Sequence, residues 1–199
     1  MIKNIIFDFG DVFINLDKPA TGRVMQKYGF TEITPQLDKI FKDYEMGHIA
    51  SEHFLEQTRA IFPKATEQNI IDAWNAILLD FPEERLQFLE DLATENKYRL
   101  FLLSNTNEIH IESERQKMGE RFTRFENAFE VFYLSYEMGK RKPNLDIFQQ
   151  VLGENNLIPE ETLFIDDTKE NTDAAQHLGI KTWNLIVGKE DITQLKSRL

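Results

Sequence analysis

Acidic, hydroxyl and lysine side chains follow apolar segments at several separate points of this sequence. Asp8 ends the apolar run NIIF, and Asp166 and Asp167 directly follow the apolar run TLFI. A carboxylate at the end of a buried strand must be paired, bind a metal or take part in chemistry, because burying an unpaired charge is costly. Ser104 follows YRLFLL, and Lys142 lies in GKRKP. Together, these residue types are suited to phosphoryl transfer.

The three carboxylates suit a magnesium site. Asp8 and the Asp166-Asp167 pair supply hard oxygen ligands, and Mg²⁺ takes one or two protein carboxylates while keeping several waters. Like charges this close would repel one another unless a cation lay among them. Gly10 fits the same site, because a residue without a Cβ lets its backbone approach the metal and offer a carbonyl ligand. We therefore expect these four residues to surround Mg²⁺.

The remaining residues suit a bound phosphoryl group. The Ser104 hydroxyl and the backbone N–H of Asn105 can hold phosphate oxygens, and Lys142 can neutralise the phosphoryl charge while it keeps the acids ionised. Asp8 is then free to attack phosphorus, which gives an aspartyl-phosphate intermediate. The sequence therefore predicts that Asp8 and Lys142 are catalytic. It predicts that Ser104, Asn105 and Lys142 bind the substrate.

Taken singly, each of these residues has a simpler explanation. Ser104-Asn105 is typical of a turn or a helix cap, and Asp166-Asp167 can cap the helix that follows. Lys142 directly precedes a proline, and a lysine in that position most often lies in a loop. The functional interpretation depends on all of these residue types falling at strand ends in one chain.

Short apolar runs alternate with helical patterns along most of the chain. Four runs are typical of buried parallel strands and a fifth is weaker: 4–9, 99–103, 162–165 and 181–187, then 131–134. Helical periodicity lies between them: 82–96, from Pro143 onward, and 168–178. This order predicts an α/β fold with a Rossmann-like, doubly wound parallel sheet. Ligands of such sheets bind beyond the carboxyl ends of the strands, where the polar residues fall.

The segment from about Leu16 to Asp80 breaks the alternation, because it shows helical periodicity and no convincing strand. Helices are expected to begin at four points: after Asp17, near Thr34, at Ser51 and at Thr66. An insert of about 65 residues is too long for a crossover and should form its own small bundle over the end of the first strand. We therefore predict a core domain of residues 1–15 and 82–199 and a helical cap of residues 16–81.

Charge and composition exclude several classes of partner. The formal net charge of −11 argues against nucleic acid and anionic membranes, although the local run Lys140-Arg141-Lys142 can still attract a small anion. No run approaches the roughly 20 apolar residues of a membrane span. The sequence has no cysteine, which excludes disulfides and thiolate metal sites. Since the chain starts without an export signal, we expect a cytoplasmic monomer or weak homo-oligomer that acts on a small phosphorylated metabolite.

Four motifs together resemble those of the haloacid dehalogenase superfamily of phosphohydrolases. They stand in that family's order over essentially the whole chain: DFGDV, LSNTN, GKRKP and FIDDTKEN. The helical insert between the first two motifs resembles the family's cap of the first type. Further segments are similar to a branch of small bacterial sugar phosphatases that includes alpha-D-glucose-1-phosphate phosphatases: LSNTNEIH, YLSYEMGKRKP, FIDDTKENTDAAQHLGI and GHIASEHF. The resemblance implies a Mg²⁺-dependent phosphatase whose substrate is a sugar phosphate.

The resemblance implies a role for each matching residue: nucleophile for Asp8, phosphoryl binding for Ser104 and Asn105, and charge stabilisation for Lys142. It also implies that Asp167 ligates Mg²⁺ directly and that Asp166 acts through a metal-bound water.

The sequence departs from the family pattern two residues after the implied nucleophile. Most phosphatases of the family carry an aspartate there as general acid and base, whereas this chain has Gly10. Asp11 is the nearest substitute, although a side chain one position along the loop usually points elsewhere. General acid catalysis typically contributes roughly 10²–10⁴-fold, so we expect a slow enzyme. A sugar 1-phosphate would depend less on such help than an alkyl phosphate, because its anomeric leaving group is less basic.

Gly10 also keeps other functions open. A catalytically weak or silent binding protein of this fold is one alternative. A metal-independent dehalogenase is another, although it would gain nothing from Asp166 beside Asp167.

Several aromatic and histidine residues have weaker assignments. Trp74 is expected in the core of the cap, and Tyr44, Glu45 and Trp74 are the candidates for substrate contacts from the cap. His110 and His177 are expected on helix surfaces, and neither has ligand-like spacing to a second histidine.

Overall fold

A parallel sheet of five strands forms the centre of the structure, a computed structural model that describes residues 1–199. The strands are β1 (Asn4–Phe7), β2 (Arg99–Ser104), β3 (Val131–Leu134), β4 (Thr162–Asp166) and β5 (Lys181–Asn184). Their spatial order is β3-β2-β1-β4-β5, and all neighbours run parallel. The chain thus builds outward from β1 to both sides, which confirms the predicted doubly wound α/β fold.

Two of the predicted strands are longer than the observed ones. The first ends at Phe7 and not at residue 9, because the backbone after Asp8 turns into a tight loop in which Gly10 pairs with Ile14. The last ends at Asn184 and not at residue 187. The weaker run at 131–134 is a full strand of the sheet.

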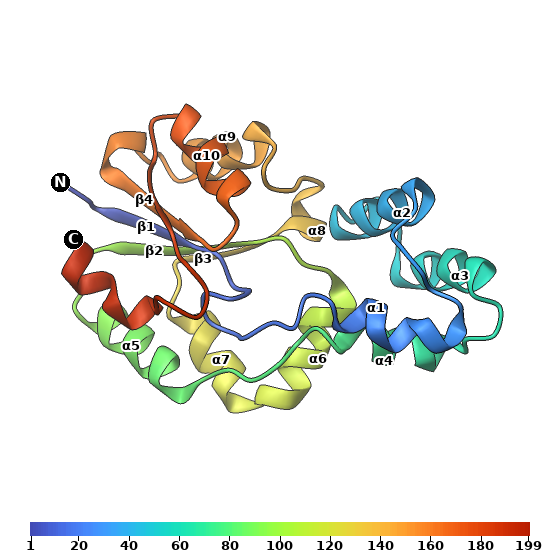
Figure 1. Cartoon of the computed structure of the whole chain (residues 1–199). Coiled ribbons are helices and arrows are strands. Elements are labelled where there is room, and N and C mark those ends of the chain that lie inside the picture. Colours follow the sequence, from blue (N-terminus) through green and yellow to red (C-terminus); the bar gives the residue numbers. More distant parts are fainter.

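Helices cover both faces of the sheet (Figure 1). One face carries α5 (Glu83–Thr94), α6 (Glu108–Met118), α7 (Glu120–Asn127) and the 3₁₀ helix η3 (Ile192–Arg198), and the other carries α9 (Leu145–Glu154) and α10 (Lys169–His177). Short pieces complete the core: α8 (Ser135–Met138) and η2 (Pro159–Glu161). Alternate residues of β1 serve the two faces, since Ile5 and Phe7 pack in one apolar cluster and Ile6 in the other.

Aromatic rings anchor the loop that follows β1. Phe9 stacks on Phe125 of α7 with ring centroids 5.1 Å apart, and Phe13 meets the same ring edge-on at 5.0 Å. Phe7 packs against Phe13 and Phe129 in the same cluster. Phenylalanine rings near both ends of the loop that carries Asp8 therefore fix it against a ring of α7.

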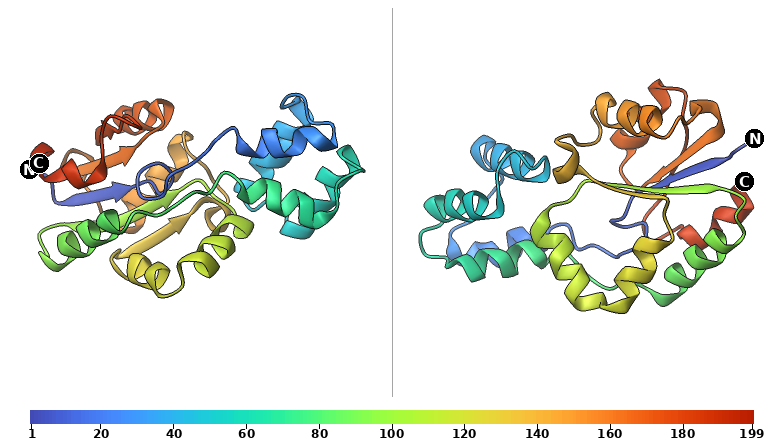
Figure 2. Two further views of the ribbon diagram at one scale, coloured as in Figure 1. Left: turned by 60° about the horizontal axis from the view of Figure 1, so that its bottom comes forward. Right: turned by 180° about the vertical axis from the view of Figure 1, so that it is seen from behind.

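The insert after β1 forms a separate helical cap beyond the carboxyl ends of the strands, and both chain termini lie at the opposite end (Figures 1 and 2). Its helices are α1 (Ala20–Met25), η1 (Gln26–Tyr28), α2 (Pro35–Glu45), α3 (Ser51–Ile61) and α4 (Glu67–Asn75). Thr34 and Thr66 cap α2 and α4 as their sequence positions predict. Trp74 is buried in the cap's own apolar cluster, which confirms its predicted place.

Two antiparallel segments connect the cap to the core. The Asn15 N–H donates to the Asp80 carbonyl, the Leu79 N–H donates to the Asn15 carbonyl, and Leu16 pairs with Leu78. The division into a core of residues 1–15 and 82–199 and a cap of residues 16–81 stays a prediction, which this short ladder supports.

Polar contacts join the cap to the core at the end of α2. The Glu45 carboxylate lies 2.9 Å from Arg141, and the Ser135 hydroxyl donates to the Glu45 carbonyl at 2.6 Å. Gly47 follows with a φ of +66°, and a Cβ there would lie 2.0 Å from the Tyr136 carbonyl oxygen. Only glycine allows this close approach of the two backbones.

The bounds of α6 and α7 were not predicted from the sequence, although a helix was expected around His110. Charged residues outnumber apolar ones in both, so their apolar faces are short and poorly marked. No helix of the structure is both long and apolar enough to cross a membrane.

Candidate active site

The carboxyl ends of β1 and β4 bring three carboxylates together. Asp8 directly follows β1, and Asp166 and Asp167 stand at the end of β4. The two strands are neighbours in register, and the Asp8 N–H donates to the Ile165 carbonyl at 2.9 Å. Oxygens of the three carboxylates lie within 4.8 Å of one another. The convergence predicted from the strand ends is therefore observed.

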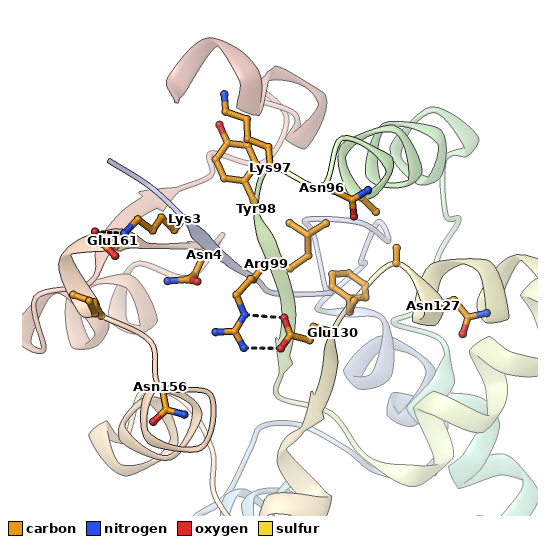
Figure 3. A pocket seen from close by; sticks show the side chains of 15 residues that line it. Lys3, Asn4, Asn96, Lys97, Tyr98, Arg99, Asn127, Glu130, Asn156 and Glu161 are labelled. Carbon is orange, nitrogen blue, oxygen red and sulfur yellow. Dashed lines mark hydrogen bonds and ion pairs between the residues drawn. The ribbon is translucent and has the colours of Figure 1, made fainter.

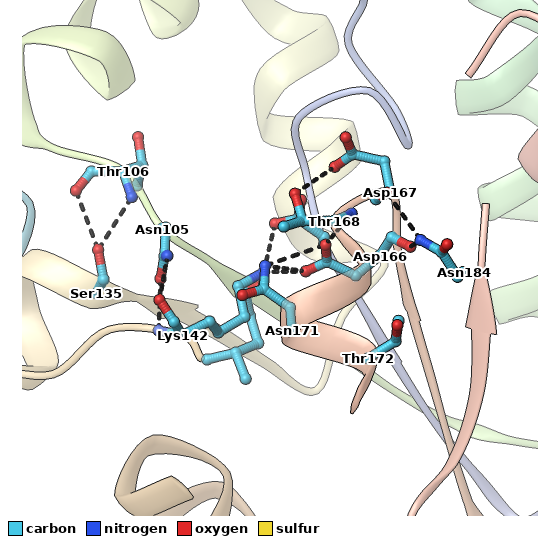
Figure 4. Close-up of polar contacts among 12 residues, drawn as sticks. Asn105, Thr106, Ser135, Lys142, Asp166, Asp167, Thr168, Asn171, Thr172 and Asn184 are labelled. Atoms are coloured by element: carbon cyan, nitrogen blue, oxygen red, sulfur yellow. Dashed lines mark hydrogen bonds and ion pairs between the residues drawn. The ribbon is translucent and has the colours of Figure 1, made fainter. Parts of the chain in front are cut away.

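Lys142 lies at the centre of this group. Its side chain is 1% exposed, and its ammonium donates to Asp8 Oδ1, Asp166 Oδ2 and the Leu103 carbonyl, each at 2.7 Å. Figure 4 shows Lys142 beside Asp166. Burial lowers the pKa of this lysine, but the two carboxylates outweigh burial and raise it. Lys142 is therefore not an ordinary loop lysine. Its ammonium is buried and bridges two carboxylates.

The negative charge of Asp8 is only partly neutralised by its neighbours. Burial is the main cause that raises the pKa of Asp8 to about 7, and repulsion from Asp166 adds to it, while Lys142 opposes both. A cation beside Asp8 would favour its ionised form. The acid cluster thus has the charge and the oxygen donors that a magnesium ion requires.

The two acids at the end of β4 have different surroundings. Asp166 is fully buried, and its oxygens accept hydrogen bonds from Lys142, from Asn171 Nδ2 at 3.1 and 3.0 Å, and from the Thr168 N–H at 2.8 Å (Figure 4). Asp167 is less buried, and the half-exposed side chain of Lys18 contacts it through its ammonium group. Asp167 therefore has more room for a direct bond to a metal than Asp166 has.

Asn105 fixes the lysine loop to the end of β2. Its Nδ2 donates to the Lys142 carbonyl and its Oδ1 accepts from the Lys142 N–H, both at 2.9 Å (Figure 4). The Asn105 N–H and the Ser104 hydroxyl make no hydrogen bond within the protein. Both residues line a cavity of about 120 Å³ together with Gly10, which leaves these donors free for an anion.

In the loop after Asp8, Gly10 has a free carbonyl, whereas the carboxylate of Asp11 is already bonded. The Gly10 carbonyl accepts no backbone hydrogen bond, so it is free to act as a ligand. Asp11, with a φ of +56°, accepts from the Leu16 N–H at 3.0 Å and lies 3.1 Å from the Lys18 ammonium. The Asp11 carboxylate therefore stabilises the loop through these two contacts, a role that the sequence did not indicate.

His110 does not lie on a helix surface, contrary to the prediction. Its ring stacks on Trp74 with centroids 5.4 Å apart, and its nitrogens contact Asn107 and the Trp74 carbonyl at 3.1 Å. The contact was not predictable, because Trp74 comes from the cap and His110 from the core. His177 is exposed, as expected.

Stability should depend on pH through His110. Burial lowers the pKa of His110 to about 4, whereas the unfolded chain takes up this proton near pH 6.5. The stability that the protein gains while His110 is neutral is therefore complete above pH 6.5 and is lost as the pH falls toward 4. Urea midpoints of the wild type should fall more steeply between pH 7 and pH 4.5 than those of His110→Gln. An equal slope in both proteins, with His177→Gln as control, would contradict the buried neutral state.

The largest cavity lies at the opposite, amino end of the strands (Figure 3). It has a volume of about 720 Å³, but its carboxylates are already engaged in ion pairs, Arg99–Glu130 and Lys3–Glu161. No cluster of unpaired acids or nucleophiles faces it. Size alone therefore does not mark the functional site.

The fold and the acid cluster define an enzyme with a Rossmann-like core, an inserted cap and a magnesium site. The model of the haloacid dehalogenase-like hydrolases matches residues 5–185 of the chain. The chain therefore belongs to this family, and the prediction of a phosphatase within it is confirmed.

Three relatives cover nearly the full chain. D-ribitol-5-phosphate phosphatase from Bacteroides thetaiotaomicron is 29% identical over 190 residues, which are 92% of this chain and 91% of the relative. The HAD family enzyme BT-2542 of the same organism, crystallised with magnesium and inorganic phosphate, is 38% identical with a TM-score of 0.85, over 96% of this chain and 97% of that one. A HAD-like hydrolase from Porphyromonas gingivalis is 34% identical with a TM-score of 0.86, over 100% and 98%.

Magnesium is the cofactor, as predicted. The acid cluster of Asp8, Asp166 and Asp167 supplies hard oxygen donors at one point, and crystal structures of the enzyme from Bacteroides thetaiotaomicron contain magnesium.

Proposed function

We propose that this chain hydrolyses a small sugar or polyol phosphate by way of a phosphoryl group carried on Asp8. The observation that carries the proposal is the position of Lys142, whose ammonium lies 2.7 Å from Asp8, from Asp166 and from the carbonyl of Leu103, the residue before Ser104. A buried ammonium beside one acid can be a structural ion pair. One that joins two acids next to free hydroxyl and N–H donors is suited to a phosphoryl group.

In this mechanism each residue of the site has a separate role. Ser104 and the Asn105 N–H bind phosphoryl oxygens, and the Lys142 ammonium offsets the charge on that group. Asp8 Oδ attacks phosphorus, the P–O bond to the leaving group breaks, and the leaving oxygen takes a proton from solvent. Water then attacks the phosphoryl group and releases inorganic phosphate, which returns the Asp8 carboxylate.

A metal site completes the proposal. The Asp8 carboxylate, the Gly10 carbonyl and Asp167 would hold Mg²⁺, with Asp166 acting through a bound water because its oxygens already accept four hydrogen bonds. The bound ion supplies charge neutralisation to the phosphoryl oxygens.

Two observations favour different members of the substrate class. One relative is named as a D-ribitol-5-phosphate phosphatase, and its substrate is a primary alkyl phosphate. Gly10 favours a better leaving group, such as the anomeric oxygen of a sugar 1-phosphate, because no side chain at this position can protonate it. Both substrates carry hydroxyl groups, which suits the Glu45–Arg141 pair at the edge of the cavity.

A panel of phosphates with and without Mg²⁺ tests the proposed function. We expect Mg²⁺-dependent release of phosphate from D-ribitol 5-phosphate, from alpha-D-glucose 1-phosphate or from both, and removal of the metal with EDTA should stop it. Release of halide from a 2-haloacid without metal would instead favour the dehalogenase. If no phosphate ester were hydrolysed at all, the chain would be the silent binding protein.

Replacing Gly10 tests whether the missing acid limits the rate. A Cβ at Gly10 would lie 2.7 Å from Leu16 Cδ1, the far end of a flexible side chain. Gly10→Asp combined with Leu16→Ala should therefore raise the turnover of alkyl phosphates, by at most about 10²-fold, and change aryl phosphates little. Gly10→Asn with Leu16→Ala is the matched control. Equal rates for the Asp and Asn variants on alkyl phosphates would show that protonation does not limit the enzyme.

A further inference from the structure

Ser135 is a fully buried serine that lies between the cap and the loop after β2. It directly follows β3 and is the first residue of α8. Its Oγ accepts a hydrogen bond from the Thr106 N–H at 3.0 Å and lies 2.6 Å from the Glu45 carbonyl oxygen (Figure 4 shows the contact with Thr106). One side chain therefore contacts both the end of α2 in the cap and the backbone that follows Asn105.

The hydroxyl proton of Ser135 has two acceptors within reach. Its Oγ lies 2.6 Å from the Glu45 carbonyl oxygen and 3.1 Å from the Thr106 carbonyl oxygen. A hydroxyl has a single proton, so it donates to one of these oxygens at a time, and the shorter contact favours Glu45. If α2 moves away, the proton turns to the Thr106 carbonyl, because a buried hydroxyl keeps a hydrogen bond where one is in reach. The partner of the hydroxyl thus depends on the position of the cap.

The backbone at Thr106 continues directly into the proposed phosphoryl site. Asn105 precedes it, and two hydrogen bonds of 2.9 Å join the Asn105 side chain to the backbone of Lys142 (Figure 4). A second route leads from the cap to the same loop, since the Glu45 carboxylate pairs with Arg141, the residue before Lys142. A displacement of the end of α2 therefore reaches the phosphoryl site through directly bonded neighbours.

We propose that Ser135 is a positioning residue that couples docking of the cap to the binding of a phosphoryl group at Asn105. The cap is docked when α2 lies against Ser135, as in this structure, and the Ser135 Oγ then fixes the backbone directly after Asn105. Loss of the Glu45 acceptor redirects the hydroxyl to the Thr106 carbonyl and changes the hydrogen bonding of that backbone. Because coupling between two equilibria is reciprocal, a bound phosphate should in turn favour the docked cap. The inference rests on the proposed phosphoryl site and gives Ser135 no contact with the substrate.

Gly47→Ala displaces the end of α2 without changing a residue of the core. A Cβ at Gly47 would lie 2.0 Å from the Tyr136 carbonyl oxygen, so the two backbones must separate. Gly29→Ala is the matched control in the cap. Gly29 also has a positive φ, of +103°, but a Cβ there meets no atom beyond its chain neighbours within 4 Å. The control therefore introduces backbone strain without a clash.

Amide spectra of the ¹⁵N-labelled full chain measure the coupling without any ligand. We expect Gly47→Ala to shift the Asn105 and Thr106 amide signals and Gly29→Ala to leave them in place. In a Ser135→Ala background, the shift caused by Gly47→Ala should largely disappear, because the hydroxyl that transmits it is absent. Two results would overturn the proposal: unchanged signals in Gly47→Ala, or shifts of equal size with and without the Ser135 hydroxyl.

Calorimetric titration with inorganic phosphate in the presence of Mg²⁺ measures the consequence for binding. Gly47→Ala and Ser135→Ala should each weaken the affinity about fivefold, and the double variant should be no weaker than the weaker single variant. Thr162→Val removes a buried hydroxyl at the amino end of β4, so it should lose stability but keep the affinity. Multiplied effects in the double variant would show that the two residues act independently and would overturn the coupling. A wild type that binds no phosphate would refute the proposed function, while the amide signals would still decide the role of Ser135.

Discussion

Asp8→Asn should abolish turnover and leave the fold intact. The amide cannot form an acyl phosphate, so we expect a loss on the order of 10⁴-fold or more in kcat on any phosphate ester that the wild type hydrolyses. The folded-state pKa of Asp8 is about 7, above the value near 4 of the unfolded chain. Ionisation of Asp8 therefore opposes folding, and this penalty grows as the pH rises from 4 through 7. Without metal, Asp8→Asn should thus gain stability relative to the wild type at pH 8 and little at pH 4.

Steady-state kinetics and urea unfolding together check this expectation. Asp146→Asn is the matched control, because Asp146 is an exposed acid at the start of α9, and it should keep wild-type kinetics. Acid quenching of the wild type during turnover should trap phosphate on the peptide that contains Asp8. Wild-type turnover in Asp8→Asn would refute a covalent intermediate on this residue.

Lys142→Met should lose both activity and stability. The substitution leaves Asp8 and Asp166 buried without their shared cation, and removing one partner of a buried ion pair costs about 3–5 kcal/mol. Loss of the charge that faces the phosphoryl group should lower kcat about 10²–10³-fold. The stability loss should be larger at pH 8 than at pH 5, because Lys142 lowers the pKa of Asp8 and its removal is felt where Asp8 would be ionised.

Lys140→Met in the same loop provides the comparison. It removes the same charge from the chain but touches neither acid, so its unfolding free energy and kcat should stay close to those of the wild type. Mg²⁺ should restore part of the stability of Lys142→Met, since the ion can replace the missing positive charge between the carboxylates. A pH-independent loss in Lys142→Met would show that lost packing, and not charge, dominates its effect.

The parts of the site that depend on local sequence were predictable, and those that depend on distant contacts were not. Asp8 and the Asp166-Asp167 pair follow apolar runs directly, and the topology of a parallel sheet then brings them together. The burial of Lys142 could not be read from GKRKP, because the partners that bury it come from β1 and β4. The same holds for His110, whose stacking partner belongs to the cap.

Helices were predictable where one apolar stripe faces the core. This holds for α5, α9 and the cap helices, whose buried residues recur at helical spacing. It fails for α6, where Ile111 and Met118 stand among charged residues and Glu114 is itself buried. The assignment of Ser104, Asn105 and the acids to their catalytic roles stays a prediction that the kinetic variants test.

The phenylalanine rings around α7 have a consequence for the energetics of each catalytic cycle. Phe9 and Phe13 hold both sides of the loop that carries Asp8 against Phe125, so the nucleophile is attached to a densely packed interior. Such a loop needs little rearrangement between the free and the phosphorylated enzyme, and its amide protons should exchange with solvent only through global unfolding. We therefore expect any rearrangement between substrate binding and product release to fall on the cap, which is joined to the core by the short ladder at Asn15, Leu79 and Asp80.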